Sequence, residues 1–148
     1  MNRRVVTIAL ALLLAIAASW ALHRLTRPYD PGSPPVDGTR VTGASLTRDR
    51  SFHWLAVELD GGIPADGMPP AIRLRDSDGV LHDSAEWQRP AAGGSGETRG
   101  TLRFWLDSRQ LAGTLTLELP GGSLAVKRST GIPPVADGRT RRFRTSNW

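Results

Sequence analysis

The sequence predicts an all-β fold, a small antiparallel β-sandwich of immunoglobulin-like type, preceded by one N-terminal transmembrane α-helix. The helix is predicted by residues 5–22, an uninterrupted run of uncharged and mostly apolar residues. The sandwich is predicted by short runs after residue 39 in which apolar and polar residues alternate, separated by turns rich in glycine, proline and aspartate. Such alternation is typical of antiparallel strands with one face in water. About seven strands at this spacing suit a sandwich, and a small barrel is the alternative.

The N-terminal apolar run is long enough to cross a membrane. Its 18 residues would extend about 27 Å as a helix, and Trp20 lies near its end, where aromatic side chains meet the membrane interface. A cleaved signal peptide is the alternative, because the small residues Ala15 and Ala17 resemble a cleavage site. The run continues past that site to Leu22, which favours a retained anchor. We therefore assign residues 1–4 to a short flank and residues 5–26 to the anchor.

The residues that flank the anchor bear on its orientation. Two arginines precede the apolar run and two, Arg24 and Arg27, follow it, so the basic side chains alone do not decide which end is cytoplasmic. The free amine at Met1 favours a cytoplasmic N-terminus. We therefore expect a single-pass protein of the bacterial inner membrane, with its C-terminal domain in the periplasm.

Composition divides the remainder of the chain into three parts. Residues 27–38, RPYDPGSPPVDG, hold four prolines and two glycines and predict an extended, semi-rigid tether. Residues 39–130 carry the alternating runs and form the predicted β-sandwich domain. Residues 131–148 begin with a proline pair and end in a basic stretch, which predicts either a free tail or a last edge strand.

Five runs alternate most clearly, and they lie at 51–60, 71–76, 101–107, 114–119 and 123–128. Turn residues at 76–79 and 120–122 predict hairpins after the second and fourth runs. Lys127 falls on the water-facing side of the last run. No stretch after residue 27 has a convincing helical period. The expected core face is made of His53, Leu55, Val57, Leu59, Ile72, Leu74, Leu102, Phe104, Leu106, Leu115, Leu117, Leu119, Leu124 and Val126.

Charge and composition exclude several classes of function. The net charge of +5 comes from the two ends of the chain, because residues 28–126 hold nine arginines against thirteen acids. A mildly acidic body argues against a broad nucleic-acid-binding surface, so we expect no nucleic-acid partner. The chain has no cysteine, which excludes a disulfide framework and a thiolate metal site.

No motif predicts catalysis or a cofactor. The chain lacks a G-x-S-x-G elbow, a phosphate-binding loop and an H-E-x-x-H pair, so we expect no enzyme, no catalytic residue and no cofactor. One group of acids surrounds His82, but its spacing is not that of an EF-hand, and we interpret it as a turn rather than a metal site. Its acidic members are Asp76, Asp78, Asp83 and Glu86.

Two tryptophans are predicted to face outward. Leu102, Phe104 and Leu106 fill the core face of run 101–107, which places Trp105 beside Arg103 on the opposite face. The same argument places Phe52 and Trp54 outside run 51–60. Outward aromatic rings next to arginine are typical of protein contact surfaces, although loops or the tail could cover them instead.

The basic tail has three interpretations. It could lie on anionic lipid headgroups, dock on an acidic partner, or form a solvated edge strand. The residues concerned are Arg141, Arg142, Phe143 and Arg144.

These features favour an accessory or assembly subunit of a membrane protein complex. Small residues in the second half of the anchor allow close contact with another helix, and they are Ala15, Ala17, Ala18 and Ser19. The expected partners are other subunits of that complex, with lipid headgroups as possible further contacts. The alternative is a cleaved, soluble periplasmic module that binds a small ligand or metal ion in the loops at 61–71 and 89–100.

Overall fold

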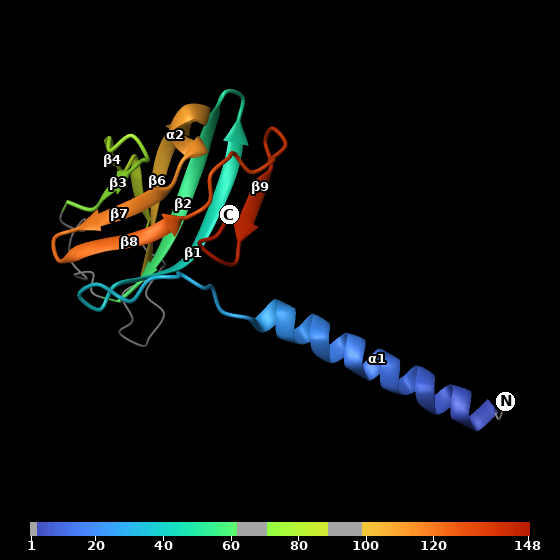
Figure 1. The fold of residues 1–148 in the computed structure, drawn as a ribbon. Helices are drawn as coiled ribbons and strands as arrows, with labels where there is room; N and C mark the ends of the chain where they lie inside the picture. Colours follow the sequence, from blue (N-terminus) through green and yellow to red (C-terminus); the bar gives the residue numbers. More distant parts are fainter. Residues whose placement is uncertain (1–2, 62–70, 89–98) are drawn as a thin grey trace.

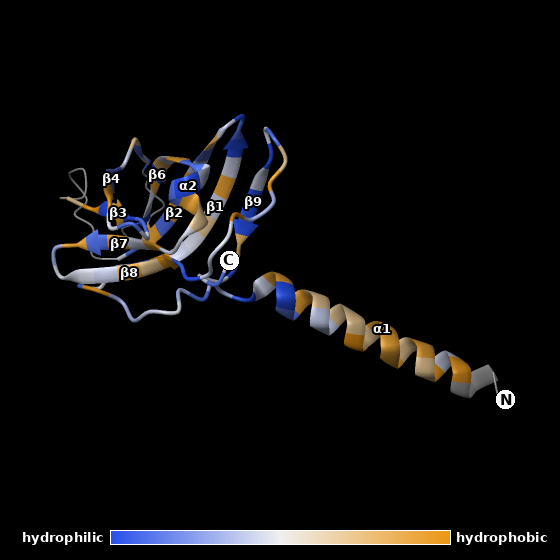
Figure 2. Ribbon diagram, turned by 45° about the horizontal axis from the view of Figure 1, so that its top comes forward, coloured by the Kyte–Doolittle hydropathy of each residue, from blue (hydrophilic) through white to orange (hydrophobic). Residues whose placement is uncertain are grey.

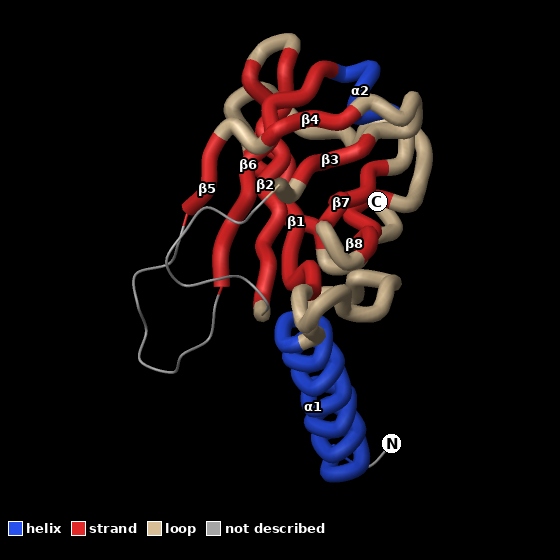
Figure 3. Tube along the Cα trace, turned by 90° about the vertical axis from the view of Figure 1, so that its left-hand side faces the viewer, coloured by secondary structure: helices blue, strands red, loops and turns tan. Residues whose placement is uncertain are grey.

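The chain forms one apolar helix and a β domain of two antiparallel sheets (Figure 1). The structure is a computed structural model and describes residues 3–61, 71–88 and 99–148. Helix α1 (Arg3–Thr26) leads away from one end of the β domain, and both sheets lie beyond that end (Figure 3). The predicted mostly-β architecture with an N-terminal apolar helix is confirmed at this level.

Helix α1 has the length and composition of a membrane span. Leucine and alanine, both good helix formers, make up half of its 24 residues. The segment Val6–Thr26 has 21 residues, and its most apolar stretch of 18 residues has a mean hydropathy of 2.1 and is not buried against the β domain. Figure 2 shows apolar residues along nearly the whole helix. A helix that is apolar on all sides and unburied is suited to a lipid environment.

The first sheet has five strands and the second has four, and every pairing within them is antiparallel. The five-stranded sheet has the order β5 (Glu86–Gln88), β6 (Arg99–Asp107), β2 (Phe52–Asp60), β1 (Arg40–Asp49) and β9 (Thr140–Phe143). The four-stranded sheet has the order β4 (Leu81–Asp83), β3 (Arg73–Arg75), β7 (Leu115–Leu119) and β8 (Gly122–Lys127). A short helix, α2 (Ser108–Ala112), connects β6 to β7.

The inner faces of the two sheets share one hydrophobic core. The predicted alternation is confirmed in β2 and β6, where Leu55 lies opposite Phe104 and both side chains are fully buried. Leu74, Leu117 and Leu124 close the core from the other sheet. The predicted turns also form, because β3 pairs with β4 across residues 76–80 and β7 pairs with β8 across Pro120 and Gly121.

Strand β1 was not among the predicted runs, and a bulge explains why. Its pairing with β2 shifts between Val41 and Gly43, and the buried residues of the strand are Val41, Gly43, Ala44 and Leu46. An inserted residue changes the phase of the alternation, which hides a strand from any search for a strict period of two.

A second bulge corrects the placement of Lys127. Leu115 pairs with Lys127 while Thr116 pairs with Ala125, which leaves Val126 as the extra residue. Both Val126 and Lys127 then face inward, and Lys127 is only 1% exposed. Its Nζ donates to the carbonyl oxygens of Gly113, at 2.8 Å, and Ser129, at 2.7 Å. Burial lowers the pKa of the Lys127 ammonium.

Helix α2 was also missed, although a local signal for it exists. Asp107 accepts a bond from the backbone N–H of Gln110 at 2.8 Å, and the Gln110 side chain accepts one from the N–H of Asp107 at 2.8 Å. This reciprocal pair is a capping box, which is readable from the sequence as Asp-x-x-Gln. Leu111 anchors the helix in the core. The helix has a single turn, too short to show a helical period.

The Pro/Gly-rich tether is extended but lies against the β domain. The N–H of Asp30 donates to the carbonyl of Arg144, and the N–H of Ser146 donates to the carbonyl of Asp30, each at 2.9 Å. Tyr29 and Val36 pack against the core. Burial raises the pKa of the Tyr29 phenol to about 12. Only residues 27 and 28 separate the end of α1 from Tyr29, the first residue of the tether that is attached to the β domain.

The C-terminal segment supplies an edge strand rather than a free arm. Strand β9 pairs with β1, with Phe143 opposite Ala44. Phe143 is 9% exposed and stacks on Trp148, with ring centroids 4.0 Å apart. Phe143 is therefore a core residue, which corrects its assignment to the partner surface.

Candidate protein-binding face

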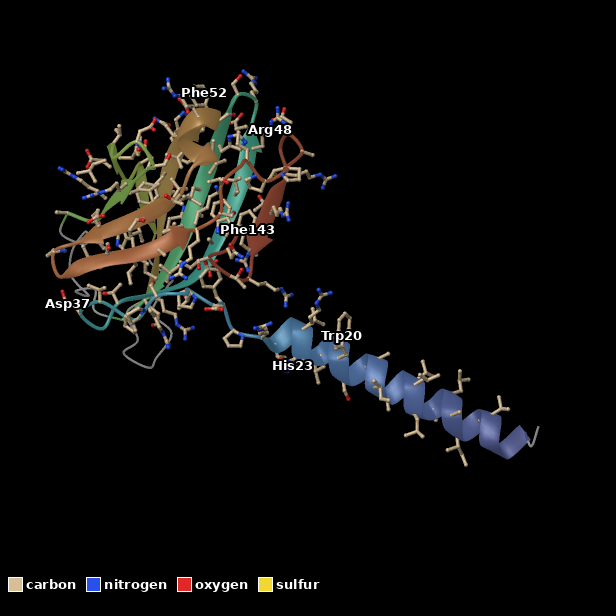
Figure 4. All side chains as sticks on the ribbon, in the orientation of Figure 1. Trp20, His23, Asp37, Arg48, Phe52 and Phe143 are labelled. Atoms are coloured by element: carbon tan, nitrogen blue, oxygen red, sulfur yellow. The ribbon has the colours of Figure 1, made fainter. Side chains whose placement is uncertain are left out.

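The outer face of the five-stranded sheet carries three adjacent aromatic rings. Trp54 on β2 lies directly opposite Trp105 on β6, and Phe52 comes one outward position before Trp54. Phe52 is 42% exposed and Trp105 is 39% exposed, while Trp54 is half-buried between its neighbours. Figure 4 places Phe52 at the end of the β domain away from α1. The outward orientation follows from the same alternation that buries Leu55 and Phe104 on the inner face.

The three rings hold one another in place. Phe52 and Trp105 are stacked at 5.0 Å between centroids with an interplanar angle of 24°. Trp54 meets Trp105 edge to face at 4.5 Å and 68°. Each aromatic contact of this kind contributes about 0.5–1.5 kcal/mol beyond the area that it buries. The rings therefore form an ordered platform, so a partner would bind them with little loss of side-chain entropy.

Arg103 extends this platform with an oriented charge. Its guanidinium lies 4.7 Å from the centroid of the Trp54 ring, and its Nη1 is 2.8 Å from Oε2 of Glu86. Hydrogen bonds from the Gln88 amide and from Arg103 hold the pKa of the Glu86 carboxyl below its usual value. Glu86 comes from edge strand β5, so the ion pair joins the edge of the sheet to its centre. We call Phe52, Trp54, Trp105, Arg103 and Glu86 the aromatic face.

Small side chains surround the large rings. Thr47 lies opposite Trp54 in the sheet, and Ala56 lies between Ser45 and Arg103. This composition, with apolar rings at the centre and a charged pair at the margin, is typical of the energetic centre of a protein interface.

The tail arginines form a separate group nearer the helix. Arg142 shares the row of Ser45, Ala56 and Arg103 in the sheet, but it binds Glu58, with Nη2 3.1 Å from Oε1. Arg141 reaches the carbonyl of Pro134 at 3.4 Å. Arg144 follows β9 beside the tether. The structure thus divides the predicted surface into the aromatic face and a basic group close to α1.

The predicted helix-packing residues do not all share one side of α1. At about 3.6 residues per turn, Ala15, Ala18 and Ser19 lie on one face, while Ala17 points to the other side. All four are exposed along the helix. The face available for close helix contact is therefore the one formed by Ala15, Ala18 and Ser19.

The acidic group around His82 forms the expected turn. Asp76 Oδ1 accepts bonds from the N–H groups of Asp78, at 3.0 Å, and Val80, at 2.9 Å. Asp76 Oδ2 lies 2.8 Å from Nε2 of His82. Asp83 pairs with Arg73 at 2.9 Å. Within residues 3–61, 71–88 and 99–148, no three potential metal ligands of the His, Asp and Glu type gather into a group.

The loops proposed for a small ligand lie mostly outside the described residues, which omit 62–70 and 89–98. The described residues next to them do border a cleft of about 660 Å³ at the end of the domain that faces α1. The tether forms one wall through Tyr29 and Pro31, and strands β2 and β6 form another through Asp60 and Thr101. The cleft depends on the docked tether, which the sequence alone did not indicate.

Glu86 is the member of the aromatic face that the sequence analysis did not assign to it. The outward positions of Phe52, Trp54, Trp105 and Arg103 were all predicted from alternation. Glu86 was considered only as a metal ligand. Its contact with Arg103 depends on the pairing of β5 with β6, which joins residues 17 positions apart and has no local signal.

Comparison of the chain with protein-family profiles, with curated proteins and with solved structures gives no match. The aromatic face and the apolar helix are therefore the features that bear on function.

Proposed function

We propose that this chain is a single-span accessory or assembly subunit of a bacterial inner-membrane protein complex, which binds its partner through the aromatic face. The observation that carries the proposal is the exposure of Phe52 and Trp105 beside the oriented Arg103. Single exposed apolar residues are ordinary, but stacked rings with an arginine are enriched where proteins bind one another.

Helix α1 supports the proposal that the chain is anchored in a membrane. Arg24 lies 4.7 Å from the Trp20 ring near the helix end, an arrangement suited to the membrane interface. The span would place the N-terminus in the cytoplasm and the β domain in the periplasm, and its Ala15, Ala18 and Ser19 face would contact a helix of the partner.

We also infer that the β domain is an immunoglobulin-like sandwich, and the strand order supports this. Strands β1, β2, β6 and β5 stand where strands A, B, E and D stand in an immunoglobulin sheet, and β3, β7 and β8 stand where C, F and G stand in the other. Strand β4 flanks β3 as C′ would, and β9 is an addition beside β1. The fold does not itself define a partner, so the proposed partner contact rests on the residues of the aromatic face.

Replacing Trp105 by glutamate is expected to release the chain from its complex. A charge in the centre of the ring cluster removes a contact of at least about 2 kcal/mol, which corresponds to roughly 30-fold in affinity. The measurement is the size of the complex formed by the tagged full chain, at native expression, after extraction in mild detergent. Leu81→Glu is the matched control, because Leu81 is 44% exposed on the other sheet.

The wild-type chain and Leu81→Glu should run as the same large species, and Trp105→Glu as the free chain. A wild-type chain that elutes alone as a monomer would contradict the proposed function. Equal loss of the complex in both variants would contradict the assignment of the aromatic face.

A second candidate is a cleaved periplasmic binding module, which the cleft of about 660 Å³ favours. Amino-terminal sequencing of the mature protein separates the two candidates. The proposed anchor predicts the uncleaved N-terminus, and a mature chain that starts at Ala18 would favour the binding module.

A further inference from the structure

We propose that a small hollow between the tether and strand β9 binds the phosphate group of an anionic phospholipid, in the membrane leaflet on the side of the β domain. The hollow has a volume of about 220 Å³. Its charged residues are Arg27, Arg142, Arg144 and Glu58, and Tyr29 forms part of its wall. We call it the arginine hollow. The inference rests on the membrane anchor of the proposed function and is independent of the aromatic face.

Four segments assemble the hollow, namely the tether, β1, β2 and the end of β9, and backbone bonds hold them together. The bonds between Asp30 and Arg144 and between Ser146 and Asp30 fasten the tether to the chain after β9. The pairing of β9 with β1 places Arg142 opposite Ser45. As a result, Arg27 from the end of α1 shares one hollow with Arg144, although the two residues lie far apart in the sequence.

The charges of the hollow are unbalanced in favour of an anion. The single carboxylate, Glu58, already accepts from Arg142 at 3.1 Å. In the described part of the chain, neither Arg27 nor Arg144 forms an ion pair. The lining of the hollow therefore holds three arginines against one carboxylate, which gives it a net positive charge. Guanidinium donors match phosphate oxygens in geometry and form charge-assisted hydrogen bonds with them.

The position of the hollow identifies the source of the phosphate. Arg27 directly follows Thr26, the last residue of α1. Trp20 and His23 mark the end of α1 that faces the β domain (Figure 4), and aromatic residues at the end of a span lie at the headgroup level. A span of 21 residues places its two ends at the two surfaces of the hydrocarbon core. The arginine hollow then opens at the depth of the lipid phosphates, where an anionic headgroup is the nearest abundant anion.

The test is native mass spectrometry of the purified full chain, released from nonionic detergent micelles that contain equal amounts of phosphatidylglycerol and phosphatidylcholine. The two lipids compete in one spectrum, so the ratio of their adducts measures headgroup preference. We expect the wild-type chain to favour phosphatidylglycerol by roughly tenfold or more. The triple variant Arg27→Gln, Arg142→Gln, Arg144→Gln should bring the ratio near one.

The matched control removes three arginines at the far end of the domain, by Arg50→Gln, Arg109→Gln and Arg139→Gln. It carries the same net charge as the hollow variant and should keep the wild-type ratio. An equal loss of preference in both triple variants would overturn the site, because the effect would then follow net charge alone. If the hollow variant does not fold, Arg144→Gln alone should reduce the preference by roughly threefold, and an unchanged ratio would overturn the proposal.

Two further experiments address separate questions. The first distinguishes a lipid phosphate from free phosphate, and the second tests whether α1 anchors the chain in the membrane. Inorganic phosphate in tenfold excess over lipid should leave the phosphatidylglycerol adducts unchanged, and their displacement would assign the hollow to a free anion instead. Extraction of membranes with alkaline carbonate tests the anchor separately. Release of the chain would refute the anchor, whereas a retained chain without headgroup preference would refute only the arginine hollow.

Discussion

Replacing Asp76 by alanine is expected to lower the free energy of unfolding by about 3 kcal/mol. The Asp76 side chain is only 4% exposed, yet it accepts from two backbone N–H groups and lies in hydrogen-bond contact with His82. Alanine leaves those donors without an acceptor and removes the frame of the turn between β3 and β4. Urea unfolding of the full chain in nonionic detergent, followed by tryptophan fluorescence, measures the difference.

Asp76 should also make stability depend on acid. Burial alone would raise the pKa of its carboxyl, but the hydrogen bonds from His82, Val80 and Asp78 outweigh burial and hold the pKa below its usual value. A carboxyl with a lowered pKa in the folded chain stabilises that chain above the pKa of the unfolded chain, which is about 4. That stabilisation is lost as the pH falls through the lowered folded pKa.

Asp76→Asn is the control for this acid dependence, since it keeps an acceptor oxygen but cannot ionise. We expect it to be less stable than the wild type by about 1–2 kcal/mol at pH 7. The difference should shrink as the pH falls below about 4. A difference that stays constant from pH 7 to pH 3 would show that the ionised form of Asp76 is not what stabilises the turn.

Gly61→Ala is expected to lower the free energy of unfolding by about 2–5 kcal/mol. Gly61 has φ of +80°, a conformation that costs a residue with a side chain about 1–2 kcal/mol. A Cβ there would lie 2.2 Å from the carbonyl oxygen of Gly38, which is backbone and cannot rotate away. The tether or the end of β2 would have to move, and overpacking of this kind typically costs a further 1–3 kcal/mol.

Gly79→Ala separates backbone conformation from steric conflict. Gly79 has φ of +82°, nearly the same as Gly61, but a Cβ there meets nothing within 4 Å. Its expected cost is therefore about 1–2 kcal/mol, from conformation alone. Urea unfolding of both variants gives the comparison. Equal losses would mean that the close approach of Gly61 to Gly38 does not restrain the tether.

The alternation of apolar and polar residues predicted a strand correctly wherever it continued without a bulge. In β2 and β6 every second residue enters the core, so the inner and outer faces could both be assigned from the sequence. The bulge in β1 and the bulge at Val126 broke that phase, which concealed a strand and misplaced Lys127. Bulges form in response to the partner strand, and no local pattern announces them.

The candidate face was predicted in part for the same reason. Trp54 and Trp105 were assigned outward because better core residues alternate with them. Their mutual contact, and the bond from Arg103 to Glu86, depend on strand register, which a single sequence does not contain. Phe143 was misassigned because its neighbours in the sequence are arginines. Its pairing opposite Ala44 and its stacking on Trp148 place it inside, and neither contact has a local signal.

The attachment of the tether limits the distance between the end of α1 and the β domain. Twelve free residues between α1 and the β domain could extend about 40 Å, at about 3.3 Å per residue. With Tyr29 packed against the core and Asp30 bonded to the segment after β9, only residues 27 and 28 are free to extend, which allows about 7 Å. In the proposed membrane-anchored state, this short connection would hold the β domain next to the bilayer. A partner of the β domain would then have to bind close to the membrane surface.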